Sequence, residues 1–396
     1  DDVVINGPVS VRANECNNLT ISSSGVLQNL AGYSYDFTIS GDLVNYGTVA
    51  TNSGGGSLYI LLYGDLDNRN VYSPVRTTLE AGNKHILSLS AGKFFGGNWI
   101  TKDTASGIVF GSYVEFRDVT LDGYSHANSP YFANIETNGY NGEFKNCNLR
   151  DFRITGTDTL DFSGSELRDL HTYGNLKVKG EFSLYVNVYL YDNITNLGVI
   201  KNVSGYGVTT YLQGNFINKG IIGNNTSSGD LYIELEGDLH NEGLYTPRRT
   251  YIRKGDNIVL SQSAGNTYQG DFYLTDSTSS ITLGSDVSFE HSNIESSYNT
   301  IKFASISTNG HSLLLDTCNL YAIDMYGNDT ITNHSTQYHH VNLWGDSKLA
   351  GDLNVYVGVS FQGDVTNLGI IKNTPGYGVT TYINSDMVND GEIRNN

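Results

Sequence analysis

The sequence has little of what several protein classes require. Of its 396 residues only 5 are Pro and 3 are Cys, and 16% are charged. Scarce Pro, together with Gly that follows no three-residue period, excludes collagen, and three Cys exclude a scaffold held by disulfides. The 23 Lys and Arg face 41 Asp and Glu, a net charge of −18, so we expect no nucleic-acid partner. No apolar run approaches the ~20 residues that span a bilayer.

What the chain does contain is typical of an ordered β protein. It has 45 Gly and 28 Tyr, and Tyr, Val, Ile and Leu recur throughout, which argues against disorder. Lys, Glu, Ala and Leu are too few for a mostly helical protein. The three Cys are expected to be buried free thiols, because the repeat described below places Cys147 and Cys318 several coils apart.

The chain repeats itself with a long period. Gly25-Val-Leu-Gln-Asn recurs as Gly-Val-Ile-Lys-Asn at Gly198 and as Gly-Ile-Ile-Lys-Asn at Gly369. Flanking landmarks keep this register, except for a two-residue change in offset that we place in a loop near residues 125–130. The repeat predicts units at 1–173 and 174–346 and a truncated third unit at 347–396, all within one continuous solenoid.

A shorter beat, Gly-x-apolar-x-Asn-x-Gly-x-apolar, runs inside each unit and is flanked by strands with two-residue alternation. A sandwich or barrel does not explain a beat of about 22 residues nested in a longer repeat, whereas a parallel β-helix explains both. We therefore predict an all-β parallel β-helix (β-solenoid), right-handed, with 22–24 residues per coil. The glycines of the beat are expected to adopt positive φ at corners. The repeating Asn side chains are expected to face inward and hydrogen-bond from coil to coil; they are Asn45, Asn68, Asn196, Asn218, Asn241, Asn367 and Asn389.

The beat Gly-x-Leu-x-Asn-x-Gly-x-Ile resembles that of bacterial cell-surface β-helix repeat proteins, the adhesin and filamentous haemagglutinin-like fibres. The resemblance covers nearly the whole chain and implies a secreted, extracellular or cell-surface protein that acts as a stalk or as a binder of glycans and cells. Because β-helices also serve as polysaccharide lyases, hydrolases and tailspikes, the resemblance indicates the fold more strongly than the function.

Carboxylates and histidines provide the candidates for chemistry. Asp65 with Asp238, Asp103 with Asp276, and Asp158 with Asp329 occupy matching places in two repeats, which favours structural turns. The acidic side chains in the irregular half of the first repeat are the best candidates for acid–base work; they are Asp118, Asp122, Glu143 and Asp151. His334, His339 and His340 have no counterparts in the first repeat. Adjacent strand residues point to opposite faces, so solvated loop histidines are favoured over a metal site; we expect no metal and no cofactor.

Tyrosines are the best candidates for binding. In the segment 184–191 the aliphatic side chains are expected to point inward and the tyrosines outward, with Tyr189 and Tyr211 stacked from coil to coil. Outward rings can pack against the C–H faces of sugars, although Tyr is also simply a good strand residue. Trp99 and Trp344 match Phe272 and Tyr173, which favours core or loop packing, but Trp99 is also a candidate on a protruding loop. The candidate glycan-binding residues are Tyr59, Tyr63, Tyr185, Tyr189, Tyr191, Tyr211, Tyr232, Tyr356, Tyr382 and Trp99.

The two ends of the chain also suggest a context. The chain begins at Asp1 without Met or a signal region, and its beat is still running at Asn396, so we expect an excised piece that is followed and preceded by further repeats of its parent chain. Open coil edges would also favour association through the ends. We therefore predict a non-enzymatic segment of a long surface protein, a rigid stalk or adhesin. The alternatives are a glycan-binding module that uses the Tyr rows, and a polysaccharide lyase or hydrolase.

Overall fold

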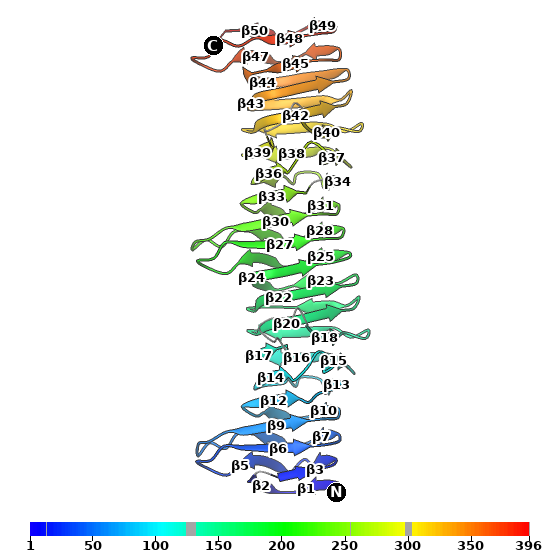
Figure 1. The fold of residues 1–396 in the computed structure, drawn as a ribbon, viewed down its shortest axis with the longest axis vertical. Coiled ribbons are helices and arrows are strands. Elements are labelled where there is room, and N and C mark those ends of the chain that lie inside the picture. Colours follow the sequence, from blue (N-terminus) through cyan, green and yellow to red (C-terminus); the bar gives the residue numbers. More distant parts are fainter. Residues whose placement is uncertain (13, 124–131, 254, 298–302, 396) are drawn as a thin grey trace. The chain divides into compact units, whose positions relative to one another are not determined.

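The computed structural model describes residues 1–12, 14–123, 132–253, 255–297 and 303–395. All regular elements in this part of the chain are strands, and the chain is a parallel β-solenoid of about 17 turns with about 22 residues per turn (Figure 1). The predicted fold class is confirmed. The predicted handedness stays a prediction.

The chain forms two compact units, Asp1–Ile194 and Thr195–Asn396. These units do not end where the predicted repeats end, and the division of the sequence at residues 173 and 346 stays a prediction. The loop predicted near residues 125–130 falls on residues 124–131, which lie outside the described residues.

The strands of the first unit are mostly three to six residues long, with longer strands toward its C-terminal side. They are β1 (Val3–Ile5), β2 (Pro8–Val11), β3 (Asn14–Cys16), β4 (Leu19–Ile21), β5 (Val26–Asn29), β6 (Tyr35–Ile39), β7 (Leu43–Asn45), β8 (Thr48–Ala50), β9 (Leu58–Leu62), β10 (Leu66–Asn68), β11 (Val71–Ser73), β12 (Arg76–Leu79), β13 (Lys84–Leu89), β14 (Asn98–Thr101), β15 (Gly107–Phe110), β16 (Val114–Arg117), β17 (Thr120–Asp122), β18 (Ala133–Glu136), β19 (Gly142–Lys145), β20 (Asn148–Thr155), β21 (Thr159–Asp161), β22 (Glu166–Tyr173), β23 (Lys177–Lys179) and β24 (Glu181–Leu190).

The strands of the second unit follow the same pattern, beginning with one that crosses the boundary between the units. They are β25 (Ile194–Asn196), β26 (Val199–Asn202), β27 (Val208–Leu212), β28 (Phe216–Asn218), β29 (Ile221–Gly223), β30 (Leu231–Leu235), β31 (Leu239–Asn241), β32 (Leu244–Thr246), β33 (Arg249–Ile252), β34 (Asn257–Gln262), β35 (Tyr268–Gln269), β36 (Asp271–Leu274), β37 (Ser280–Leu283), β38 (Val287–Glu290), β39 (Asn293–Ser296), β40 (Ala304–Ser307), β41 (Leu313–Asp316), β42 (Asn319–Tyr326), β43 (Thr330–Trp344), β44 (Ser347–Val357), β45 (Val359–Phe361), β46 (Val365–Asn367), β47 (Ile370–Asn373), β48 (Thr381–Ile383), β49 (Met387–Asn389) and β50 (Glu392–Arg394).

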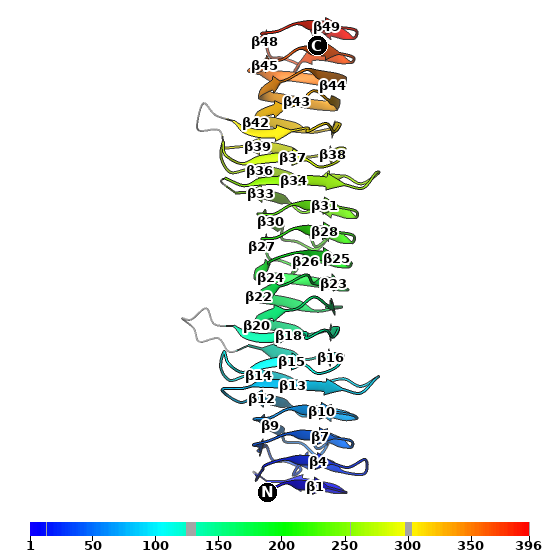
Figure 2. The same ribbon diagram turned by 90° about the vertical axis from the view of Figure 1, so that its right-hand side faces the viewer.

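Strands of successive turns lie side by side within each unit, as Figure 2 shows. They pair in parallel, and their register places like residues above one another. In the first unit Leu19, Leu43, Leu66 and Leu87 align across β4, β7, β10 and β13, and all four are fully buried. Alternation along a strand selects these positions, because inward side chains recur every second residue. The core of each unit is therefore a set of continuous apolar columns.

A glycine stands two residues after every ladder asparagine except Asn68, and its role differs from the one predicted. Gly220 and Gly243 do not have positive φ; a Cβ on Gly220 would lie 2.0 Å from the carbonyl oxygen of Gly198, and a Cβ on Gly243 would lie 2.0 Å from that of Gly220. The prediction that the beat glycines turn corners in the left-handed region is wrong for this column. They are needed because backbones of consecutive turns approach too closely for any side chain.

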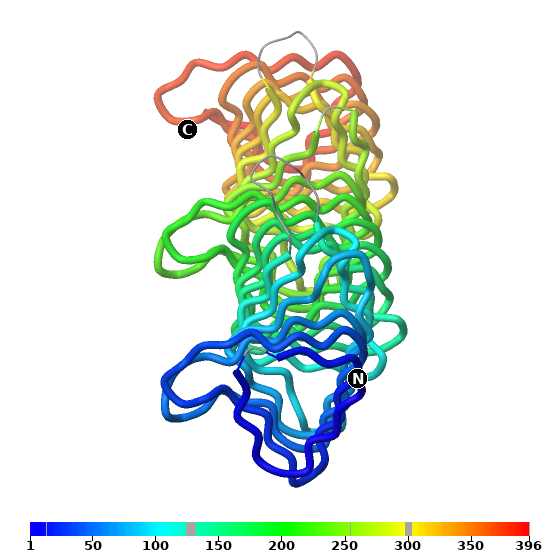
Figure 3. Tube along the Cα trace, turned by 60° about the horizontal axis from the view of Figure 1, so that its bottom comes forward, coloured from blue at the N-terminus to red at the C-terminus, as the bar shows by residue number. Residues whose placement is uncertain are grey.

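Paired loops project from the side of the turns in each unit (Figures 1 and 3). In the first unit they follow β5 and β8, at residues 30–34 and 51–57, and in the second they follow β26, β29 and β47. The loops lie between strands at matching places of the repeat. The number of residues per turn also varies along the chain. Hydrogen-bonded partners in consecutive turns lie 18 residues apart at Asp169 and Asn187 but 28 apart at Asp118 and Asn146.

Candidate functional site

The seven asparagines predicted to form a ladder lie at the ends of short strands, and six of them are fully buried. The Nδ2 of Asn196 donates to Asn218 Oδ1 at 2.8 Å, and the Nδ2 of Asn218 donates to Asn241 Oδ1 at 2.9 Å. Asn45 donates to Asn68 at 2.7 Å, and Asn367 donates to Asn389, which is exposed, at 2.7 Å. These side chains bond to one another and to backbone, so they hold turns together.

Ladder amides also bond to backbone groups, some in the next turn and some in their own corner. Asn218 Nδ2 donates to the backbone oxygen of Leu244 at 3.0 Å, and Asn196 Oδ1 accepts from the backbone nitrogen of Gly198 at 3.0 Å. A buried amide with all of these partners repays its desolvation. The role of this column is to build the fold.

The role of a second repeated asparagine was missed by the sequence reasoning. Asn29 Nδ2 donates to the backbone oxygens of Tyr33, at 2.8 Å, and Gly55, at 3.0 Å, and so ties together the two projecting loops of the first unit. Asn202 bonds in the same way to Tyr206 and Ser228 in the second unit. The repeated Gly-Tyr pairs that follow these asparagines were the signal. Tyr33, Tyr206 and Tyr377 are exposed on the loops.

The tyrosines predicted to point outward are half-buried or exposed along the outer surface. Several lie near a cation or an imidazole. Arg76 is over Tyr59 at 4.6 Å, Arg253 over Tyr211 at 5.4 Å and Arg168 over Tyr185 at 5.3 Å. His171 lies 4.6 Å from Tyr189 and His339 lies 4.2 Å from Tyr356. Tyr191 stacks on Tyr173 at 4.6 Å, Tyr232 lies 6.3 Å from Tyr251, and Tyr63 and Tyr382 are exposed. Tyr189 and Tyr211 belong to different units, and the stacking of one on the other stays a prediction.

Trp99 is not a surface ligand platform. It is 1% exposed, and its ring lies 5.3 to 5.7 Å from those of Tyr72, Phe95 and Phe116 in the core of the first unit. Core packing, one of the two predictions for this residue, is correct, and its inclusion among the glycan-binding candidates is wrong. The Gly-Gly pair before it suggested a loop tip, but β14 carries the ring inward.

The histidines were also placed wrongly. His334, His339 and His340 lie in the long strand β43 and not in a solvated loop. His339 is buried between Tyr321 and Tyr356, 4.2 Å from each ring, and burial lowers the pKa of its imidazole. Within the described part of the chain, no group of three or more His, Cys, Asp or Glu side chains is placed to hold a metal ion.

The carboxylates that repeat between units make structural hydrogen bonds. Asp103 accepts from Ser106 and Asp276 from Thr278 within local turns, as predicted. Asp65 accepts from the backbone nitrogen of Ile86 at 2.8 Å, and Asp238 from that of Val259 at 2.8 Å, so these bonds join consecutive turns and not one turn to itself. Asp158 and Asp329 likewise accept from Gly139 and Gly310 of the preceding turn.

The four acidic candidates separate into two groups. Asp118 accepts from Asn146 at 2.9 Å, and Glu143 pairs with Lys145. Neither is among the charged groups that act on Asp151. Asp122 and Asp151 come together with Arg150, Arg168 and Asp169 on the outer face of β17, β20 and β22. Burial, together with the charges of Asp169 and Asp122, raises the pKa of Asp151 to about 6.

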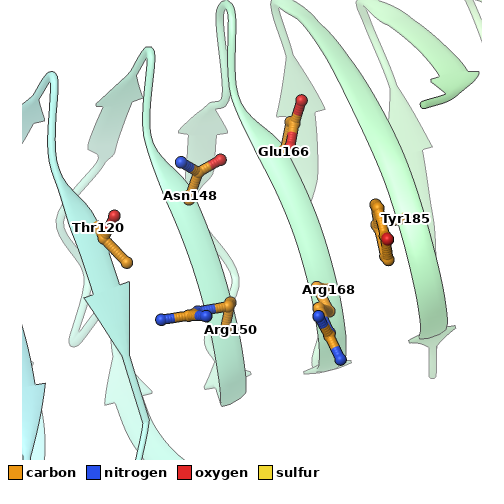
Figure 4. Close-up of a pocket in the computed structure, with 6 residues that line it drawn as sticks. All are labelled: Thr120, Asn148, Arg150, Glu166, Arg168 and Tyr185. Atoms are coloured by element: carbon orange, nitrogen blue, oxygen red, sulfur yellow. The ribbon is translucent and has the colours of Figure 1, made fainter. Parts of the chain in front are cut away.

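This face bears a polar hollow of about 310 Å³. Two rows of outward residues flank the inward leucines of the strands: Thr120, Asn148 and Glu166 align in one row, and Asp122, Arg150 and Arg168 align in the other. Tyr185 of β24 closes the hollow (Figure 4). We call this surface, lined by Thr120, Asn148, Arg150, Glu166, Arg168 and Tyr185, the arginine groove.

A β-bulge positions Tyr185. The register between β22 and β24 pairs Leu167 with Leu184 and Arg168 with Val186, so Tyr185 is the extra residue of the bulge. Asn187, two residues later, has φ of 50° and donates from Nδ2 to Asp169 at 2.7 Å. Bulges re-aim side chains in this way. The sequence alternation predicted an outward Tyr185 but gave no sign of the bulge.

The arginines of the groove are each held by one carboxylate. Arg150 Nη2 donates to Asp122 Oδ2 at 2.7 Å, and Arg168 Nε donates to Asp169 Oδ2 at 3.1 Å. Arg168 also lies over the Tyr185 ring, a cation–π contact that holds the ring in place. Guanidinium groups have five N–H donors, so both arginines keep donors for a ligand.

The remaining expectations concern cysteines and membranes. Cys16, Cys147 and Cys318 are buried free thiols, as predicted, and burial raises the pKa of Cys147 and Cys318 to about 12. Among the described residues, no helix is both long and apolar enough to cross a membrane.

No protein-family model matches the chain, and no curated protein matches it either.

Proposed function

We propose that this chain is a non-enzymatic segment of a long repetitive extracellular surface protein, where it serves as a rigid stalk or adhesin. The buried amide ladder supports this role most strongly. It repeats from turn to turn in both units, with donor–acceptor distances of 2.7 to 2.9 Å. Stacked turns of this kind gain stability from each neighbour, which suits a load-bearing element.

The likeness of the Gly-x-Leu-x-Asn-x-Gly-x-Ile beat to bacterial surface fibres supports the same proposal, because those proteins are stalks and adhesins. In this role the parent chain would supply further repeats on both sides. The outward side chains would then provide contacts to surface glycans or to cells.

Incubation with polysaccharides tests the non-enzymatic part of the proposal. The chain is mixed with neutral and uronate-containing polysaccharides, and new reducing ends and unsaturated uronates are measured over time. We expect no product above the level given by heat-unfolded chain. Time-dependent release of either product would contradict the proposal and favour a hydrolase or a lyase.

Glycan binding is the second candidate function, and one observation favours it. Aromatic side chains form continuous outward rows: Tyr321, His339, Tyr356 and Tyr377 follow one another in the second unit at centroid distances of 4.2 to 4.4 Å. Aromatic rings combined with polar neighbours suit sugars, which present C–H faces and hydroxyls.

Substitution of Tyr189 and Tyr211 by Ala, read out on a glycan array, separates the two candidates. The glycan-binding role predicts weaker binding to every glycan that the unchanged chain retains. The stalk role predicts that the substitutions leave the array unchanged.

A further inference from the structure

At equivalent positions of the repeat, the two units carry different outward side chains. The strand registers of the second unit align Asn293, Asn319 and Gln337 in one row and Glu295, Tyr321 and His339 in the other. Tyr356 occupies the same bulge as Tyr185, because the pairing of β43 with β44 also skips one residue there. The backbone device is thus shared, while the outward residues are not.

These different side chains leave a hollow in the first unit, where the second unit has stacked rings. In the second unit the rings of Tyr321, His339 and Tyr356 stack on one another and cover their own faces. In the first unit Arg150 and Arg168 replace Tyr321 and His339 in the register, and a hollow of about 310 Å³ lies between the rows. The arginine groove is therefore a feature of the first unit and not a requirement of the fold.

The groove lies across the strands and has the length of an oligomer. It is lined from β17, β20, β22 and β24, and three intervals between neighbouring strands amount to about 14 Å. A ligand along this line would cross successive turns. An extended polymer fits such a path better than a compact small molecule.

The lining groups are those that bind hydroxyl-rich molecules. Glu166 and Asn148 offer acceptors, Arg150, Arg168 and Asn148 offer donors, and Thr120 offers a hydroxyl. Tyr185 supplies a half-buried ring for C–H packing.

The charges around the groove select against a polyanion. Glu166, Asp122, Asp151 and Asp169 give four carboxylates against the two guanidinium groups, in a chain of net charge −18. A uronate or sulfate would meet this excess of like charge. Hydroxyl groups can use the carboxylates as acceptors and the arginines as donors at once.

We propose that the arginine groove binds a neutral, hydroxyl-rich polysaccharide, with one sugar ring packed on Tyr185 and its neighbours hydrogen-bonded along Glu166, Asn148 and Arg150. This inference rests on the glycan-binding role proposed above and names its site and ligand class. An acidic polysaccharide and an acidic peptide are the competing ligands, and the test includes both.

Affinity electrophoresis tests the proposal with the full 396-residue chain. Native gels contain a soluble neutral polysaccharide (dextran, mannan, xyloglucan or a mixed-linkage β-glucan), a polyuronate, a sulfated glycan or polyglutamate. We expect retardation by at least one neutral polysaccharide, with little change between low and physiological salt, because no net charge is exchanged. Retardation only by the polyanions, lost as salt rises, would overturn the proposal.

Variants then locate the site. Tyr185→Ala should weaken binding to the retained neutral polysaccharide by about tenfold, the usual size for an aromatic contact residue, whereas Tyr185→Phe should keep most of the affinity because it keeps the ring. Arg168→Gln should also weaken binding. The matched control is Tyr46→Ala, because this exposed tyrosine of the first unit also lies under an arginine, Arg69 at 4.7 Å, but does not line the groove; it should leave the affinity unchanged. Tyr356→Ala, at the equivalent bulge of the second unit, tests the aromatic row as the competing site. Circular dichroism melting curves confirm that each variant is folded.

The outcomes distinguish a failure of the groove as the binding site from a failure of glycan binding as a whole. If Tyr356→Ala weakens binding and Tyr185→Ala does not, the chain binds glycans but the groove is not the site, and this inference falls alone. If no polysaccharide retards the chain, the glycan-binding role and the groove fall together.

Discussion

Asparagine has two roles on this chain, and burial separates them. Asn218 is fully buried, and its Nδ2 donates to Asn241 and to the backbone of Leu244. Asn193 makes a bond of the same kind, to Asn175 at 2.9 Å, but at an exposed position. An amide–amide bond at the surface competes with water, and a buried one does not.

Substitution of Asn218 by Ala should therefore be costly. It removes three hydrogen bonds, with the Asn196 amide, the Asn241 side-chain oxygen and the Leu244 backbone oxygen, so we expect a loss of roughly 2–4 kcal/mol in the free energy of unfolding. Asn193→Ala, the exposed control, should lose about 0.5 kcal/mol or less. Urea denaturation of both variants checks this, and equal losses would show that the ladder contributes nothing special.

The raised pKa of Asp151 predicts that the stability of the fold depends on pH. Burial and the charges of Asp169 and Asp122 raise its pKa to about 6, despite the opposing effect of Arg150 and Arg168. Since the folded pKa exceeds the unfolded one, the carboxyl favours folding below pH ~3.9, and this contribution is lost as pH rises through about 6.

Asp151→Asn should consequently gain stability relative to the unchanged chain at neutral pH and gain none in acid. Because the side chain is only half-buried, we expect only about 1 kcal/mol between the two limits. Denaturation curves on both sides of the transition provide the measurement. The exposed residue Asp390, replaced by Asn, is the control, and a difference between Asp151→Asn and the unchanged chain that does not vary with pH would refute the assignment.

At the scale of elements, close approach of consecutive turns sets the positions of glycine. Gly198, Gly220 and Gly243 follow one another in consecutive turns, and Gly220 and Gly243 each leave room for the carbonyl oxygen of the glycine one turn before. The same oxygens accept backbone hydrogen bonds, from Ile221 at 2.8 Å and from Leu244 at 2.9 Å. A side chain here would separate two turns and break their ladder.

Gly220→Ala tests this element directly. The added methyl group would lie 2.0 Å from the Gly198 oxygen, so the backbone must move, and we expect a loss of roughly 2–4 kcal/mol in unfolding free energy. Gly378→Ala is the control, because nothing lies within 4 Å of the added Cβ and its φ is ordinary. Thermal melts compare the two, and a neutral Gly220→Ala would mean that the turns are not packed as tightly as described.

At the scale of the whole molecule, repetition made the fold predictable. The 22-residue beat, the inward aliphatic residues and the buried Asn column all follow from side chains that must match the turn below, and such matching repeats in sequence. Outward side chains do not have to match those of the turn below. Arg150 and Arg168 therefore gave no signal in the sequence, since their grouping depends on strand register and on a bulge at Tyr185.

Trp99 and His339 are residues whose surroundings the sequence did not predict. Both look like ligand-binding residues in sequence, but the fold buries Trp99 in an aromatic cluster and stacks His339 between two tyrosines. Local composition suggested a loop at each place. Which residues face inward in an irregular turn is decided by the register of its neighbours, and that register is not visible in the local sequence.

Native-state hydrogen exchange, followed by mass spectrometry on the intact chain, tests most directly the claim that buried columns hold the turns together. The account predicts that peptides covering β28 and β31 exchange slowest, that the projecting loop at residues 224–230 exchanges fast, and that Asn218→Ala speeds exchange in β28 and β31. Exchange in β28 and β31 as fast as in that loop, in the unchanged chain, would contradict it.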